Sequence, residues 1–221
     1  MGKFFLTLLL MFMLLIGSLF FIPINFFVSS LIKNLDVDIE YSYLEGNIFS
    51  GKILDLYYDN NFIGDFNYKN QFTFKDISAN FYSIDEKNIA GTVVKELHNI
   101  TDIGTIVLKD FSVSSIVSTD LIKYVDLHLN VEELDIKNFE CAYINGNLKI
   151  SSQEINEELI GELACFEGNT ISAELFNKRM KELGNITYSD SQIQVRISTK
   201  IIPDRRVQLL MDYVSFTIDL Q

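Results

Sequence analysis

The stretch Val125-Asp-Leu-His-Leu-Asn-Val131 decides the fold class, because apolar and polar residues alternate in it without a break. Successive side chains of a β-strand point to opposite faces, so a period of two predicts a strand with one buried and one polar face. The segment Gln192–Ser198 repeats the pattern, with Ile193, Val195 and Ile197 as its apolar positions. Both segments are typical of half-buried strands in an antiparallel sheet.

Shorter alternating segments are spread over the chain from residue 36 onward. They are centred on the apolar pairs Leu54/Leu56, Leu134/Ile136, Leu148/Ile150, Ile171/Ala173 and Phe216/Ile218. Strands at intervals of roughly 8–15 residues leave little room for helical crossovers between parallel strands. The sequence therefore predicts an all-β domain, either an antiparallel meander or an incompletely closed β-barrel or sandwich.

Turn residues suggest where the strands end. Asn145-Gly146 predicts a two-residue hairpin, and Asp59-Asn60-Asn61 and Glu167-Gly168-Asn169 are weaker turn signals. Two segments lack the alternation, residues 174–183 (followed by Gly184) and residues 203–213. Their apolar spacing favours short helices.

The N-terminal segment is apolar enough to cross a membrane. Residues 4–32 carry no charge, and residues 4–22 are almost entirely Leu, Phe, Met and Ile. About 19 residues at 1.5 Å each cover about 28 Å, close to the hydrocarbon thickness of a bilayer. We expect residues 1–3 to be a cytoplasmic tip, residues 4–27 a transmembrane anchor, residues 28–35 a linker and residues 36–221 a periplasmic β domain.

Two other interpretations of this segment remain open. A cleaved signal peptide would have a shorter apolar region and small residues before the cleavage site, for which Val28-Ser29-Ser30 is the only candidate. A buried helix of a soluble domain is the other. The orientation rests on Lys3 and a weak excess of positive charge on the inside. Both the anchor and the signal-peptide interpretations place the domain on the far side of the membrane.

The domain is acidic. From residue 34 onward, 16 basic residues (18 less Lys3 and Lys33) stand against 30 acidic ones, a net charge of −14. Such a field repels nucleic acids and anionic lipid surfaces, which argues against both as partners.

The residue types that carry chemistry are sparse. The two histidines, His98 and His128, have no Cys or His at metal-ligand spacing, and we interpret both as surface residues. The chain contains no Gly-x-Ser-x-Gly turn and no glycine-rich loop before a helix. We therefore expect no catalytic, metal-binding or cofactor-binding residue, no small-molecule substrate and no enzymatic activity.

The two cysteines, Cys141 and Cys165, both fall in expected strands of the exported domain. An even number of cysteines in an oxidising compartment favours a disulfide. Two buried free thiols are the alternative.

One region resembles a known family. The sequence Tyr-Leu-Glu-Gly-Asn-Ile-Phe-Ser-Gly-Lys-Ile at 43–53, followed by Phe-Ile-Gly-Asp-Phe-Asn-Tyr at 62–68, is similar to the protein N family of bacterial type II secretion systems. The matching positions of the two motifs are Gly46, Ile48, Phe49 and Gly51, and then Gly64 and Tyr68. Phe49 and Tyr68 stand where the family has Trp. Residues 104–111 and the two cysteines around a Gly-x-Leu segment extend the likeness.

The resemblance implies a single-pass inner-membrane protein of a bacterial cell. It would act as a non-catalytic accessory scaffold of the secretion system, through contacts with other secretion-machine proteins. The glycine–aromatic motif indicates architecture rather than a ligand site, with Phe49 expected to be buried at the end of a β layer.

Two other functions remain candidates. The first is a lipid-handling β-groove protein, similar to the AsmA-like and lipopolysaccharide-bridge proteins, which would require a continuously apolar, open concave face. The second is the sensor or inhibitor domain of an envelope enzyme.

Overall fold

The computed structural model describes residues 39–219 apart from 59, 85–87, 100–101, 103, 118–123, 139, 154, 156, 167–169, 190–191 and 203–204. It also describes a few isolated residues between 11 and 28. The strands are β1 Ile39–Gly46, β2 Ser50–Tyr58, β3 Asn61–Phe72, β4 Asp76–Ser83, β5 Ala90–Glu96, β6 Ile106–Val117, β7 Val125–Lys137, β8 Glu140–Ser152, β9 Leu159–Phe166, β10 Thr170–Phe176, β11 Glu182–Ser189, β12 Gln192–Ser198 and β13 Tyr213–Asp219. The short helices are η1 Leu97–Asn99, η2 Thr199–Ile201 and α3 Arg205–Leu210.

All thirteen strands belong to one antiparallel sheet, and each pairs with its neighbours in sequence. The prediction of an all-β antiparallel meander is confirmed. The sheet does not close into a barrel, because β1 and β13 lie at its opposite edges. The alternating segment that begins at Val125 lies in β7, and the segment Gln192–Ser198 is β12.

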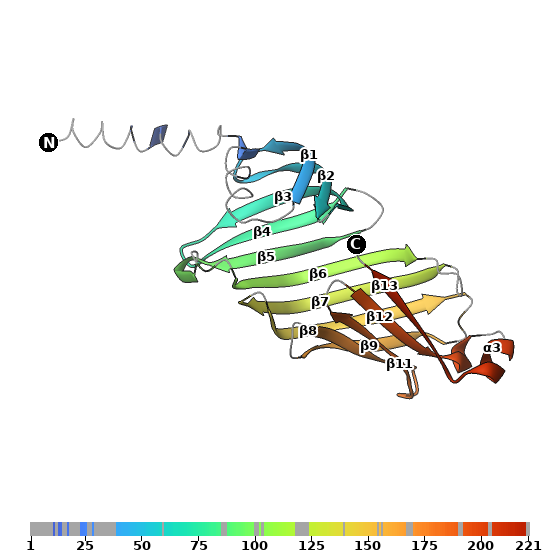
Figure 1. The fold of residues 1–221 in the computed structure, drawn as a ribbon. Coiled ribbons are helices and arrows are strands. Elements are labelled where there is room, and N and C mark those ends of the chain that lie inside the picture. The colour runs from blue at the N-terminus through green and yellow to red at the C-terminus, as the bar shows by residue number, and fades with distance from the viewer. Residues whose placement is uncertain are drawn as a thin grey trace.

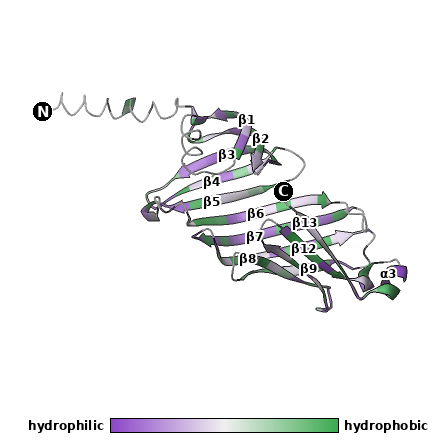
Figure 2. Cartoon of the chain, viewed as in Figure 1, coloured by the Kyte–Doolittle hydropathy of each residue, from purple (hydrophilic) through white to green (hydrophobic). Residues whose placement is uncertain are grey.

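One face of the sheet is apolar over many strands, because the strand register aligns the apolar positions. Leu129 of β7 lies opposite Leu148 of β8, and Val195 of β12 lies opposite Ile186 of β11. Figure 2 shows the result, hydrophobic and hydrophilic residues interleaved along the strands rather than gathered in separate elements.

The later strands turn back across the apolar face of β7 and β8 (Figure 1), and the main core lies between the two layers. Leu159 of β9 and Leu175 of β10 are fully buried in this core. Ile201 of η2 is buried in the same cluster, so the connection between β12 and β13 closes one end of the core. At this end Thr199 donates a hydrogen bond from its hydroxyl to the carbonyl of Met211, at 2.7 Å.

The predicted hairpin at Asn145-Gly146 is wrong. Both residues lie inside β8, where Asn145 pairs with Glu133 and Gly146 pairs with Val131 of β7. Gly146 forms no turn but lets neighbouring atoms approach its backbone closely. A Cβ at this position would lie 2.8 Å from the carbonyl oxygen of Asn130 and 3.0 Å from a methyl carbon of Leu163.

The helix predicted for residues 174–183 is also wrong. This segment is the end of β10, a turn and the start of β11. The side-chain oxygen of Asn177 accepts hydrogen bonds from the backbone N–H groups of Arg179 and Lys181, both at 3.0 Å, and Met180 adopts a positive φ of 57°. These local bonds stabilise a turn in place of helical bonds.

Two other local predictions hold. The helix expected within residues 203–213 is present as α3, Arg205–Leu210. The turn at Asp59-Asn60-Asn61 joins β2 to β3, and Asn60 has the positive φ of 62° that such a turn favours. The turn expected at 167–169 falls between β9 and β10 but lies outside the described residues.

The predicted cytoplasmic tip, anchor and linker (residues 1–3, 4–27 and 28–35) lie outside the described residues except for isolated positions. Among the residues that the structure describes, no helix is long and apolar enough to span a membrane. Two of the isolated positions contact β1 or the turn that follows it: Pro23 forms a bridge with Asn47 of the turn, and the hydroxyl of Tyr41 in β1 donates a hydrogen bond to Asn25 at 3.2 Å.

A candidate apolar cavity

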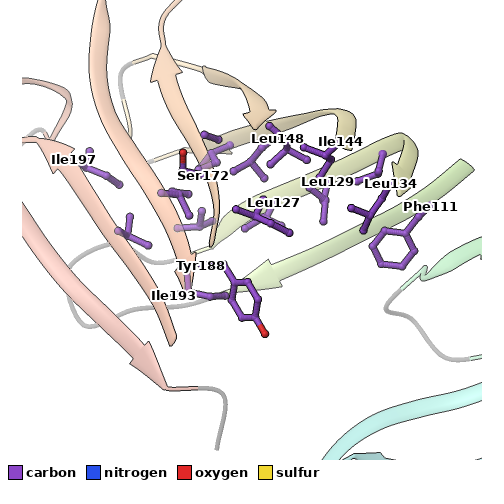
Figure 3. A pocket seen from close by; sticks show the side chains of 18 of the residues that line it. Phe111, Leu127, Leu129, Leu134, Ile144, Leu148, Ser172, Tyr188, Ile193 and Ile197 are labelled. Atoms are coloured by element: carbon purple, nitrogen blue, oxygen red, sulfur yellow. The ribbon is translucent and has the colours of Figure 1, made fainter. Parts of the chain in front are cut away.

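A cavity of about 550 Å³ lies between the layer formed by β6–β8 and the layer formed by β10–β12. The lining side chains come from the seven strands β6–β12 and one loop: Leu108, Phe111, Val125, Leu127, Leu129, Val131, Leu134, Ile144, Leu148, Ile150, Ile155, Leu163, Ile171, Ser172, Ala173, Ile186, Tyr188, Ile193, Val195 and Ile197. Figure 3 shows side chains from the two layers pointing toward each other across this space.

The chemistry of the lining is almost entirely hydrocarbon. Among the described residues, Ser172 and the hydroxyl of Tyr188 are the only polar side-chain groups of the lining, and none of its side chains is charged. The strand period explains this, because alternate residues of β7 (Val125–Val131) and of β12 (Ile193–Ile197) face the cavity. Asp126, His128 and Arg196 lie on the opposite, exposed face. An apolar wall of this kind can bind hydrocarbon.

The described residues offer no metal centre either. Within the described ranges, no three His, Cys, Asp or Glu side chains gather closely enough to hold a metal ion. His98 lies 3.3 Å from Glu96 on the exposed surface, and the ring of His128 lies 2.9 Å from the Ser114 hydroxyl. Neither histidine therefore belongs to a group of potential metal ligands within the described ranges.

The motif residues lie together at the corner formed by β1–β3. Gly46 adopts a φ of +118°, and a Cβ at Gly51 would overlap the carbonyl oxygen of Glu45. The Tyr68 hydroxyl donates a hydrogen bond to the carbonyl of Asn47 at 2.9 Å, and burial raises the pKa of Tyr68 to about 12. Backbone geometry and the hydrogen bond of one neutral phenol hold this corner together.

The aromatic at the centre of this motif is less buried than predicted. Phe49 is only partly buried and packs edge-on against Phe72, with ring centroids 5.6 Å apart. Phe49 lies in the turn between β1 and β2, at the end of the strands, where its ring is less enclosed than that of a residue in the middle of a strand. Ile48 contributes its carbonyl, which accepts a hydrogen bond from the side chain of Asn70 at 2.9 Å. Gly64 has a φ of +142° opposite Leu56, where the β2–β3 register shifts.

Cys141 and Cys165 come from neighbouring strands and lie at disulfide distance, with Cα atoms 5.7 Å apart. The backbone pairing of β8 with β9 runs only from Asn147 opposite Glu162 to Ile150 opposite Leu159. The cysteine pair therefore links the two strands beyond the end of their hydrogen-bonded ladder. The lining residues Ile144 and Leu163 lie close by in sequence.

No protein-family model matches the chain, and neither a curated protein nor a solved structure is significantly similar to it. The resemblance to the protein N family consequently stays a prediction.

Sequence reasoning identified many cavity residues as strand residues but none as a binding site. The alternation in β7 and β12 marks Leu127, Leu129, Ile193 and Val195 as inward-facing. An inward-facing residue of a closed core has the same pattern as one that lines an open cavity. The separation between the layers, which distinguishes the two, is a property of the tertiary structure.

Proposed function

We propose that this chain is a lipid-handling β-groove protein of the cell envelope, which binds the hydrocarbon part of a lipid in the cavity between β6–β8 and β10–β12. The observation that carries the proposal is the continuous apolar lining of a cavity of about 550 Å³. Ligand sites commonly have volumes of about 300–1,000 Å³ and are mostly apolar with few polar groups.

The energetics favour a hydrocarbon occupant. Large apolar surfaces left open to solvent are uncommon on soluble domains and mark binding sites. Each methylene group transferred from water into such a site contributes about 0.8 kcal/mol. A polar substrate would gain little, because Ser172 and Tyr188 supply the only polar side-chain groups among the described lining residues.

The experiment is native mass spectrometry of the full-length chain, released from a non-ionic detergent after purification from cells. The test variant is Leu129→Trp, which places a large side chain inside the cavity. The matched control is Leu209→Trp, since Leu209 lies on α3, outside the cavity, and is 87% exposed. We expect the wild type and Leu209→Trp to carry acyl lipids and Leu129→Trp to carry much less.

Folding of the variants can be checked in the same samples. The chain has no Trp, so each variant reports its environment through one indole. A folded Leu129→Trp variant should emit at shorter wavelength than Leu209→Trp, because its indole is in an apolar site. If that folded variant retained the full lipid load of the wild type, the proposal would be wrong.

A second candidate is an accessory role in type II secretion, as a non-catalytic scaffold in the inner membrane. It is supported by the β1–β3 corner, where Gly46, Gly51 and Tyr68 lie together in space as one structural unit. β1 is also an edge strand, able to pair with a partner. A photo-crosslinker in place of the exposed Tyr43 should capture a secretion component in cells, and one in place of Tyr143 should not.

A further inference from the structure

The cavity is closed at one end and open at the other. Along β12, Ile197 and Val195 are buried and Ile193 is only partly buried. Along β10 the same change occurs, from the fully buried Leu175 through Ala173 to the partly buried Ile171. β10 and β12, which lie on either side of β11, thus become more exposed in the same direction.

The closed end is filled by side chains. Ile201, Ile202 and Ile155 are buried in the same cluster as Leu159 and Leu175. A ligand cannot pass through packed hydrophobic residues of this kind without disrupting the core. The entrance is therefore at the opposite end.

Three cross-strand neighbours mark the entrance. Tyr188 of β11 pairs with Ile171 on one side and Ile193 on the other. Tyr188 is 36% exposed, and Figure 3 shows its hydroxyl directed away from Ile197. Within the described part of the chain, no residue forms a hydrogen bond with this hydroxyl, which leaves it available to a ligand.

The charges restrict the head group of that ligand. The described part of the lining carries no cation that could pair with an anionic head, and residues 34–221 carry a net charge of −14. An anion brought to this entrance is repelled, to an extent that falls as salt screens the field. A phenol hydroxyl, in contrast, hydrogen-bonds to an uncharged ester or hydroxyl group.

We infer that the cavity binds one amphiphile with a single head group, and that the hydrocarbon tail enters first. The Tyr188 hydroxyl at the entrance hydrogen-bonds the uncharged or zwitterionic head group. This inference rests on the proposed function and adds the direction of entry, the class of head group and the residue that recognises it. Tyr188 acts here as a binding residue for the head, while the inner lining binds the tail.

The experiment compares three probes with the same acyl chain: monopalmitoylglycerol, palmitoyl lysophosphatidylcholine and palmitate. Each is titrated into the full-length chain, and the bound fraction is measured by native mass spectrometry. The test variant is Tyr188→Phe, which removes only the hydroxyl. The matched control is Tyr143→Phe, because Tyr143 is 50% exposed on β8 and does not line the cavity.

We expect Tyr188→Phe to bind monopalmitoylglycerol about five-fold more weakly, the equivalent of about 1 kcal/mol for one neutral hydrogen bond. Tyr143→Phe should bind it as the wild type does. Palmitate should bind more weakly than monopalmitoylglycerol, with a difference that narrows as the salt concentration rises.

Two results would overturn the inference and leave the proposed function intact: equal binding of monopalmitoylglycerol by the wild type and Tyr188→Phe, or tightest binding of palmitate at low salt. Failure of all three probes to bind the wild type would instead refute the proposed function, and the inference with it.

Discussion

The double substitution Cys141→Ser with Cys165→Ser should destabilise the domain by about 3.5 kcal/mol. The two residues are 24 positions apart, and their Cα separation of 5.7 Å lies in the normal range for a disulfide. Closing a loop of about 25 residues lowers the entropy of the unfolded chain by about 12 cal/mol/K, which gives this free energy at 25 °C. The effect is large beside the usual 5–15 kcal/mol of total stability.

The assay is urea unfolding of the oxidised wild type and the double variant, followed by circular dichroism. With a slope of about 2 kcal/mol/M, the loss corresponds to a midpoint lower by about 1.7 M. The slope itself should rise, because an unfolded chain without the crosslink exposes more surface. Adding a reductant should shift the wild type and leave the double variant unchanged, which serves as the control.

Thiol labelling shows directly whether Cys141 and Cys165 form a disulfide. Unfolded, unreduced wild type should contain no reactive thiol. Two reactive thiols, together with a urea midpoint that does not respond to reductant, would show that Cys141 and Cys165 are free thiols and form no disulfide.

The fully buried Leu175 should lose about 3–5 kcal/mol of unfolding free energy on substitution by Ala, measured by urea unfolding, whereas the exposed Leu209→Ala should change it little. Gly51→Ala should lower the melting temperature, because its Cβ would overlap backbone atoms at the β1–β2 corner; an unchanged melting temperature would contradict the geometry. Hydrogen bonds from Lys149 and Lys178 lower the pKa of Glu158 below its ordinary value of 4.5. The resulting stabilisation is present above pH 4.5 and is lost as the pH falls through the lowered pKa, so Glu158→Gln should reduce the acid-side slope of stability against pH.

The type of many elements was predictable from local sequence. Alternation over β7 and β12 is a local consequence of the two-residue strand period and needs no tertiary information. The short helix α3 and the turn at Asn60 were also predictable, because helix spacing and the positive φ of Asn are properties of a few residues.

Local sequence failed where a longer-range contact competed with it. Asn145-Gly146 has the composition of a hairpin turn, but pairing with β7 continues β8 through it. Residues 174–183 have helical spacing, but the side chain of Asn177 organises a turn between two paired strands. The burial of Phe49 was overestimated, since an aromatic at a strand end needs a second layer to cover it.

By itself, the sequence determined that the domain is an antiparallel β structure with one apolar and one polar face, since that depends only on the alternation of side chains along each strand. The tertiary structure decided that β10–β12 lie across β6–β8 at a distance that leaves a cavity, closed beside Ile201 and open beside Tyr188. The physical reason is that the separation and burial of two layers depend on sheet curvature and on contacts between residues far apart in the chain. No local pattern encodes these contacts.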